Sequence, residues 1–230
     1  MKKLLVSIFI LSSLVYASGM GDSKKHKMMF QSVPMDKASI LQDGKSKMYC
    51  PVCGMTLPMF YKTNHAATHK GHTKQYCSMH CLAEDKIKNG FDAKDMKVVD
   101  AKTYKFIDVN KATYVVGSSK KGTMTMISKY AFLDLKDAQK FARENGGKIM
   151  GFKEAYKTSA DSLEKDMKMV EKKQSKMSEK GKMIYNKMCK KTDKKFTSTA
   201  DAKTFVKSSK ICGDMHGKKL QAVGIYLGRR

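Results

Sequence analysis

The sequence predicts an α+β protein: a small antiparallel domain of strands packed with one helix, followed by a small, mainly helical C-terminal module. Residues 97–152 contain short segments rich in β-branched and aromatic residues, a capped helical segment interrupts them, and beyond Tyr156 the pattern becomes helical. The order strand, strand, strand, helix, strand favours this class over alternating parallel units. With 230 residues and 41% hydrophobic content, the chain can bury a core in one domain or two modest ones.

Residues 1–17 have the pattern of an export signal. Lys2 and Lys3 precede an apolar run from Leu4 to Val15, and Ala17 offers a small residue for cleavage. This run is too short for a membrane-spanning helix, which needs about 20 residues. We therefore expect a cleaved signal and a periplasmic mature protein. Residues 18–47 are polar and rich in Lys, Ser and Met, and they are predicted to form a flexible tether.

The segment 48–89 contains four of the six cysteines and four of the six histidines, with prolines and glycines that favour turns. We therefore expect a metal site carried by loops. Cys50 and Cys53 should face one point across a tight turn, and Cys77 and Cys81 are one helical turn apart. Two such pairs indicate a single metal site. Two alternatives remain: plain disulfides, the default in an exported chain, and thiol–disulfide exchange by Cys50 and Cys53.

The residues around the cysteines favour copper over zinc. Four thiolates suit tetrahedral zinc, but Met55, Met59 and Met79 also lie close to the cysteines in sequence. A thioether adds little for zinc and is a good ligand for the soft Cu(I) ion. Cu(I) is thus the expected metal and zinc the alternative. Four histidines are further candidate ligands for copper: His65, His69, His72 and His80.

The segments after the cysteines are predicted in order as follows. Residues 97–104 and 105–117 read as strands joined by a turn at 100–102, and residues 123–132 as a third strand. A helix should begin after Asp134, a favoured N-cap residue, and end at Asn145-Gly146-Gly147. Residues 148–152 return as a strand.

Residues 157–180 are predicted as an amphipathic helical linker. Asp161 and Glu164 form a capping-box pattern at its start. Its apolar seam repeats at steps of four, three, four and three residues: Leu163, Met167, Val170, Gln174 and Met177. We expect these methionines to be packing or partner contacts rather than metal ligands.

The charge of the chain bears on its partners. Lys and Arg number 46 against 21 Asp and Glu, a net charge of +25, but only Arg143, Arg229 and Arg230 are arginines. Specific nucleic-acid binding is not expected, because base readout favours the planar guanidinium group. The charge allows peripheral association with an anionic membrane or an acidic partner. A solvated lysine-rich surface is the simpler interpretation.

Several motifs between Met48 and Tyr156 resemble the NosL family of nitrous oxide reductase accessory proteins. They are Cys50-Pro51-Val52-Cys53-Gly54-Met55, Val98-Val99-Asp100, Ala112-Thr113-Tyr114-Val115-Val116-Gly117, Gly122-Thr123-Met124-Thr125, Ala131-Phe132 and Gly146-Gly147. The resemblance implies a ββαβ-like fold over residues 48–156. It also implies an exported Cu(I) chaperone, not an enzyme, that helps assemble the copper centres of nitrous oxide reductase together with its maturation machinery.

The same resemblance assigns ligands residue by residue. Cys50, Cys53 and Met55 match the family's metal motif, Met124 matches the methionine of its Pro-Met segment, and Cys81 matches a later cysteine. Thr123 stands where that proline is usual, Cys77 is an addition, and residues 15–20 lack the family's lipid-anchoring cysteine. The candidate metal ligands are Cys50, Cys53, Met55, Cys77, Cys81 and Met124.

Residues 181–230 are predicted as a small helical module. Its start at Gly181 to Cys189 and its end at Leu220 to Tyr226 resemble a small cytochrome c. Covalent haem attachment needs a C-x-x-C-H motif, whereas Cys189 is followed by two lysines. We therefore expect a haemless module in which Cys189 pairs with Cys212, the other cysteine of this segment, in a disulfide.

Overall fold

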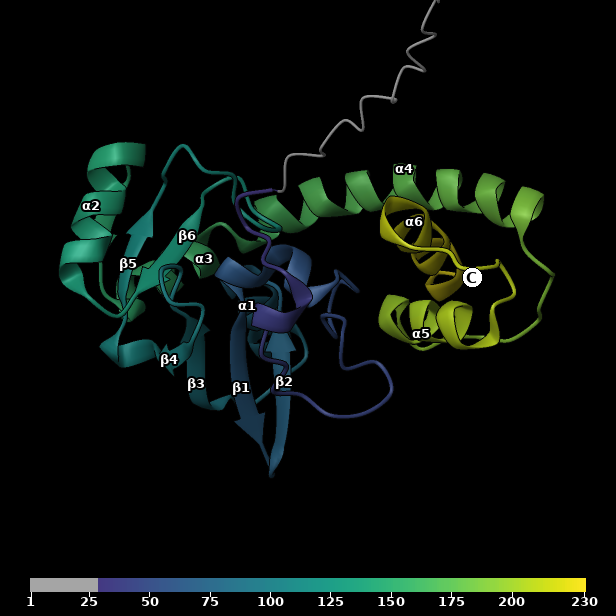
Figure 1. Cartoon of the computed structure of the whole chain (residues 1–230), viewed down its shortest axis with the longest axis horizontal. Helices are drawn as coiled ribbons and strands as arrows, with labels where there is room; N and C mark the ends of the chain where they lie inside the picture. The colour runs from purple at the N-terminus through teal and green to yellow at the C-terminus, as the bar shows by residue number, and fades with distance from the viewer. Residues whose placement is uncertain (1–28) are drawn as a thin grey trace, which may run out of the picture.

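The computed structural model describes residues 29–230, so the predicted signal and residues 18–28 of the predicted tether lie outside the described residues. Two antiparallel sheets form the N-terminal part of the described fold (Figure 1). The first contains β1 (His65–His69), β2 (His72–Tyr76), β3 (Lys94–Val99) and β4 (Phe106–Asp108), in the order β2-β1-β3-β4. The second contains β5 (Thr113–Val116), β6 (Lys129–Phe132) and β7 (Lys148–Met150), in the order β6-β5-β7.

The two sheets are built on the same ββαβ plan. In each, a hairpin is followed by a helix, and the next strand returns to pair with the first strand of the hairpin. The helices are α1 (Met79–Lys88) in the first unit and α2 (Leu135–Asn145) in the second. A bridge between Asp100 and Ala131 joins the units. The α+β prediction is confirmed, and the ββαβ arrangement implied by the family resemblance occurs twice.

Helix α2 follows its predicted limits. The Asp134 carboxylate accepts a hydrogen bond from the backbone N–H of Lys136, and Gly146 ends the helix at φ 71°. Ala138 and Phe141 are buried on the face that packs against Val115 and Tyr130. Local capping therefore sets both ends of this helix.

The predicted strands are longer than those of the structure. Residues 105–117 divide into β4 and β5 because the Asp108 side chain caps a short 3-10 helix, η3 (Val109–Lys111). Of residues 123–132 only β6 is a strand, since Met124 has φ 61°, a left-handed conformation that interrupts extended backbone. The turn expected at 100–102 is present, held by hydrogen bonds to the Asp100 carboxylate.

The expectation of a flexible tether is wrong for residues 29–47. This segment, which includes the 3-10 helix η1 (Met35–Lys37), packs against the first unit. Val33 is 5% exposed, and its N–H donates to the carbonyl of Pro58. Gln42 and Gln75 also hold the segment, since Gln75 Oε1 accepts from the Leu41 N–H and Gln42 Oε1 accepts from the Gln75 N–H. Buried amides thus fix a segment whose polarity suggested a linker.

Four helices complete the chain: α3 (Phe152–Asp161), α4 (Leu163–Met188), α5 (Thr199–Ser209) and α6 (Gly217–Gly228). Helix α4 extends from the sheets to α5 and α6, so the predicted boundary at residue 181 falls inside one continuous helix (Figure 1). Gly181 allows α6 to approach, because a Cβ there would lie 2.0 Å from the carbonyl oxygen of Ala222. The expected Cys189–Cys212 disulfide is present. Within residues 29–230, none of the helices combines the length and apolarity needed to cross a bilayer.

Candidate metal centre

The first cysteine pair lies in a tight loop that precedes the 3-10 helix η2 (Leu57–Thr63). The Cys50 N–H donates to the Met55 carbonyl at 2.9 Å, and the Gly54 N–H donates to the Cys50 carbonyl at 2.8 Å. Gly54 has φ 69°, in the left-handed region that glycine adopts without steric cost. These bonds fold the loop so that both thiols lie on its inner side.

The second pair lies where β2 ends and α1 begins, so this half of the site is carried by a short loop and the first turn of a helix. Cys77 directly precedes the helix N-cap residue Ser78, and Cys81 is in the first turn of α1. Thr63 Oγ1 donates to the Cys77 carbonyl at 2.8 Å, and the same oxygen is 2.9 Å from Thr123 Oγ1. The hydroxyl of Thr123, the residue that replaces the family's proline, thus ties the second ββαβ unit to the cysteines.

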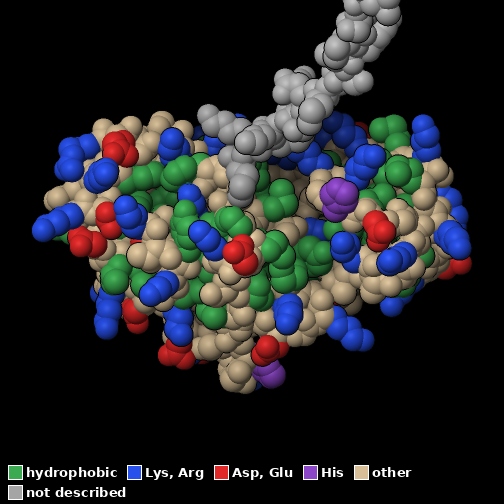
Figure 2. All heavy atoms as spheres, in the orientation of Figure 1, with side chains coloured by type: hydrophobic (Ala, Val, Ile, Leu, Met, Phe, Trp, Pro, Cys, Tyr) green, Lys and Arg blue, Asp and Glu red, His purple; other side chains and the backbone are tan. Residues whose placement is uncertain are grey.

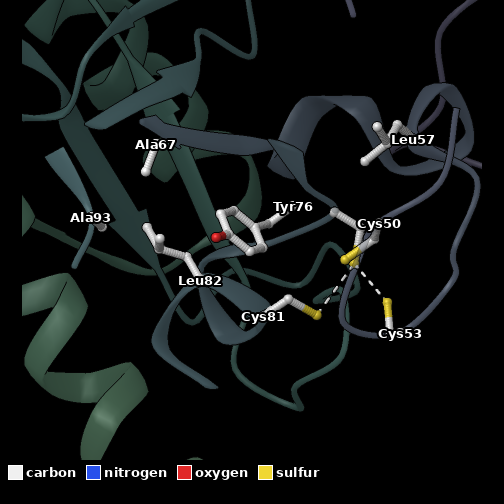
Figure 3. Close-up of a cluster of buried hydrophobic side chains, with 9 residues drawn as sticks. Cys50, Cys53, Leu57, Ala67, Tyr76, Cys81, Leu82 and Ala93 are labelled. Carbon is white, nitrogen blue, oxygen red and sulfur yellow. Dashed lines mark hydrogen bonds between the residues drawn. The ribbon is translucent and has the colours of Figure 1, made fainter. Parts of the chain in front are cut away.

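The four cysteine sulfurs converge on one point, and Figure 3 labels three of these residues there, Cys50, Cys53 and Cys81. All of them lie within 4.8 Å of one another, with Cys53 Sγ 3.4 Å from Cys77 Sγ and Cys77 Sγ 3.7 Å from Cys81 Sγ. Four sulfurs arranged tetrahedrally at about 2.3 Å from a metal ion are about 3.8 Å apart. The thiols are free, and their spacing fits a soft metal ion.

The cysteine cluster, defined as Cys50, Cys53, Cys77 and Cys81, is shielded from water. Each of these residues is at most 3% exposed, and the surrounding side chains include Leu57, Tyr76 and Leu82 (Figure 3). In such surroundings an unpaired charge is costly, so neutral thiols are favoured until a cation arrives. Metal binding must therefore displace protons from the cluster.

The thiols of the cluster differ in acidity. Burial raises the pKa of the Cys50 thiol, but hydrogen bonds from the other three cysteine side chains outweigh burial and leave it well below its usual range. Burial and hydrogen bonds with Cys50 and Cys53 raise the pKa of Cys77 well above that range, and hydrogen bonds with the other cysteines do the same for Cys81. Cys50 is therefore the most acidic thiol of the cluster.

Both candidate thioether ligands pack against the buried hydrophobic core that contains the four cysteines. Met55 directly follows Gly54, and Met124 comes from the β5–β6 connection, where it lines a hollow together with Cys53; both methionines are half-buried. The six sequence-predicted ligand residues are thus neighbours in space, although Met124 is far from the others in the chain.

The histidines expected as further copper ligands do not join the cysteines in one group. Among residues 29–230, the one group of three or more potential Cys, His, Asp or Glu ligands is the cysteine cluster itself. His65 is buried beside the Tyr114 hydroxyl, and burial lowers its pKa to about 4. His69 and His72 flank the β1–β2 turn, and His80 is buried 3.4 Å from the Glu84 carboxylate. His65 is therefore a neutral core residue.

The C-terminal helices cover the cysteine loop. Lys203 of α5 is 1% exposed, and its ammonium group donates to the Gly54 carbonyl at 2.6 Å, to Gln221 Oε1 at 2.7 Å and to Thr56 Oγ1 at 3.2 Å. Burial lowers the pKa of Lys203 to about 7, while the charges of Cys53 and Cys50 act in the opposite direction. Sequence reasoning missed Lys203, because a lysine in a lysine-rich helix gives no local signal of burial.

One side of the cluster reaches a hollow of about 320 Å³. Cys53 and Met124 form part of its wall, and residues of α4, including Met167 and Gln174, form the opposite side. Cys53 is the cysteine of the cluster that lines this hollow, so the hollow is the side from which the site can be approached.

The lysine-rich surface shows no single basic patch on the face seen in Figure 2. Lys and Arg side chains are spread over this face, with Asp and Glu among them (Figure 2). On this face the distribution fits a solvated surface with a general positive potential.

Comparisons with known proteins identify relatives of this chain. The NosL family model matches residues 42–160, just over half of the chain. Among solved structures, the chain is similar to the copper chaperone NosL from Shewanella denitrificans, with 27% sequence identity and a TM-score of 0.41, over 51% of this chain and 95% of that chain. A search of curated proteins finds no match.

Proposed function

The chain belongs to the NosL family, and we propose that it is an exported Cu(I) chaperone, not an enzyme, that helps assemble the copper centres of nitrous oxide reductase. The observation that supports this proposal is the buried cysteine cluster, with Met55 and Met124 packed against the hydrophobic core that contains it. Thiolate and thioether sulfur together select Cu(I) among the metals available to a cell. The candidate ligands are Cys50, Cys53, Met55, Cys77, Cys81 and Met124.

The arrangement supports both holding and releasing the ion. Cu(I) enters as cargo, the thiols lose protons, and the charge of the ion is balanced by thiolate inside a dry environment. Release requires a ligand that a partner can reach. Cys53 fulfils this requirement, because it lines the hollow beside Met124 whereas the other three cysteines are enclosed. A partner's sulfur ligand entering there can replace one ligand at a time.

Export is part of the proposal. The four thiols of the cluster are free rather than disulfide-bonded, and in an oxidising compartment such thiols persist when a metal ion occupies them or a partner keeps them reduced. The Cys189–Cys212 disulfide is consistent with that compartment. We propose that residues 1–17 direct export to the periplasm, where the overall positive charge favours encounter with acidic surfaces of the partner.

A zinc-stabilised interaction module is the second candidate, and a specific observation favours it. A cluster of four cysteines within 4.8 Å has the composition of a structural zinc site. The thioethers distinguish the two metals, since zinc gains little from Met55. The third candidate, thiol–disulfide exchange, has less support because residues 51–53 form a turn rather than the start of a helix that would activate Cys50.

Anaerobic metal competition tests the proposal. The mature protein should take Cu(I) from a chromogenic Cu(I) chelator, and Met55→Leu should weaken Cu(I) binding by about tenfold while leaving Zn(II) affinity unchanged. Met59→Leu is the matched control, because Met59 is exposed on η2 and does not pack against the cluster. Tighter binding of zinc than of Cu(I) by the parent protein, or equal loss of both metals in Met55→Leu, would overturn the copper assignment.

The partner is tested in cells. A strain lacking the gene should make nitrous oxide reductase in normal amount but with low copper content, and added copper should restore part of its activity. Transfer from the loaded protein to the metal-free reductase should slow as salt concentration rises, since steering by the net charge is screened. A fully metallated reductase in the deletion strain under copper limitation contradicts this role and leaves copper storage as the better account.

A further inference from the structure

A second hollow lies between the metal-binding domain and helix α4. It has a volume of about 260 Å³, and four methionines line it: Met55, Met124, Met169 and Met177. It adjoins the hollow that Cys53 lines, and the two share Met124, Val170 and Gln174 as walls. Four methionines therefore border a groove that continues into the hollow lined by Cys53.

The side chains of α4 leave this space unfilled. In the apolar seam of α4 Leu163 alone is buried, while the other four members remain half-buried: Met167, Val170, Gln174 and Met177. Side chains chosen for packing would close such a space, because protein interiors are normally filled. Here space remains beside thioethers from three separate segments of the chain.

The backbone at Met124 is a second observation that points to this groove. Met124 has φ 61°, a conformation that costs free energy for any residue with a Cβ. Such conformations cluster at ligand-binding positions, where surrounding structure holds them. Met124 is the methionine that lines both hollows, so the residue with the unfavourable backbone conformation is the one that connects the groove to the cysteine cluster.

We propose that the groove is a second Cu(I) site, in which Met169 and Met177 of α4 bind the ion together with Met55 and Met124, the two thioethers that this site shares with the cysteine cluster. Thioethers are neutral and need no deprotonation, so they hold Cu(I) more weakly than thiolates and do not retain zinc. The ion at this site is exchangeable and lies next to Cys53. The inference rests on the proposed function and deepens it: α4 adds a waiting position for the cargo that the cysteine cluster carries.

Charge around the groove keeps its affinity for copper low. The Lys173 ammonium group donates to Met169 Sδ at 3.4 Å, and both residues line the groove. The Lys173 contact competes with copper for the Met169 sulfur, and the flexible methionine side chain allows that sulfur to exchange partners. Lys168 also borders the adjoining hollow, together with the carboxylates of Glu84 and Glu171. A site bordered by lysines holds a monovalent cation loosely, as transfer requires.

The test uses the full mature protein, handled without oxygen and with its disulfide intact. Stepwise Cu(I) titration against chelators of graded affinity should show a tight equivalent and a weaker one. The double substitution Met169→Leu/Met177→Leu keeps volume and hydrophobicity, so the fold should remain, while the weaker equivalent should lose affinity by about tenfold or more. Met183→Leu/Met188→Leu is the matched control, since these residues are exposed on the same helix, outside the groove.

A spectroscopic measurement identifies the ligands directly. In selenomethionine-labelled protein, X-ray absorption at the copper edge should show copper–selenium scattering that grows with the second equivalent and falls in the Met169→Leu/Met177→Leu variant. Cys53→Ser should weaken the tight equivalent and leave the groove signal in place, so failure of the proposed function and failure of this inference are distinguishable. The inference is overturned if the affinity of the weaker equivalent is unchanged in Met169→Leu/Met177→Leu, or if the control Met183→Leu/Met188→Leu loses as much affinity.

Discussion

The contact between the cysteine loop and the C-terminal helices can be tested at one glycine. Gly54 has φ 69°, and a Cβ on it would lie 2.4 Å from Thr199 Cγ2 and 2.7 Å from Thr199 Cβ. Gly54→Ala therefore adds backbone strain and forces α5 away from the loop. Gly44→Ala supplies the matched control, because Gly44 also has a positive φ, of 88°, but a Cβ on it would have no neighbour within 4 Å.

The two substitutions separate strain from contact. An alanine in the left-handed region costs about 1–2 kcal/mol, and this is the whole effect expected at Gly44. At Gly54 overpacking against Thr199 adds about 1–3 kcal/mol. The free energy of unfolding should therefore fall by about 2–5 kcal/mol in Gly54→Ala and by about 1–2 kcal/mol in Gly44→Ala. The difference between them measures how firmly α5 rests on the metal-binding loop.

Urea unfolding of the metal-free protein, followed by circular dichroism and by tyrosine fluorescence, measures these losses. Adding Thr199→Ser to Gly54→Ala removes Cγ2, the closest atom, and should recover part of the stability. Cu(I) affinity of Gly54→Ala should fall as well, since the loop that carries Cys50 and Cys53 must shift. Equal destabilisation by Gly54→Ala and Gly44→Ala would refute the reasoning, because it would mean that the helices do not press on the loop.

Three further predictions concern buried charge and the disulfide. The pKa of Lys203 is about 7 in the folded protein and 10.5 when unfolded, so the unfolded chain binds more protons between these two pH values. The stability of the metal-free protein, compared with that of Lys203→Met, should therefore rise with pH across this window, by up to about 1.4 kcal/mol per pH unit. Urea unfolding measures this change. Burial opposes ionisation of Asp85, but hydrogen bonds from Lys74, Asn89 and Tyr76 leave its pKa lowered. The substitution Asp85→Asn should therefore cost about 1–3 kcal/mol of stability at pH 7, and this cost should shrink as pH falls below 3.8. Thermal unfolding at a series of pH values checks this. Replacing both Cys189 and Cys212 by serine should lower the free energy of unfolding by about 3 kcal/mol, because the disulfide joins residues 23 positions apart and so restricts the unfolded chain. Unchanged stability on urea unfolding would contradict this role of the disulfide.

Local sequence signals determined much of this protein. The spacing of the two cysteine pairs predicted the converging thiols, because a tight turn and one helical turn each bring two side chains together over a few residues. The caps around α2 and the turn at Asp100 were likewise predictable, since a carboxylate and nearby backbone N–H groups settle them. Motif order along residues 48–156 was enough to indicate the family.

Other features depended on tertiary contacts. His65, predicted as a candidate ligand, is a core residue because β1 places it against Tyr114 of the second unit. Residues 29–47 are held by hydrogen bonds to residues about thirty positions away along the chain, such as those that join Leu41 and Gln42 to Gln75. The strand expected at 123–132 is shortened by the left-handed conformation of Met124, which its sequence neighbourhood does not reveal.

The enclosure of the metal site by the C-terminal helices was the feature that the sequence could least predict. Lys203 and Gly54 are 149 residues apart, and their hydrogen bond exists because α4 carries the C-terminal helices back onto the first cysteine pair. A periodic pattern identifies the face of a helix that will be buried but not the surface it will meet, since that surface forms only when distant segments pack. The amino-acid sequence thus determined which sulfur atoms meet, whereas only the tertiary structure decided what encloses them and which side remains open.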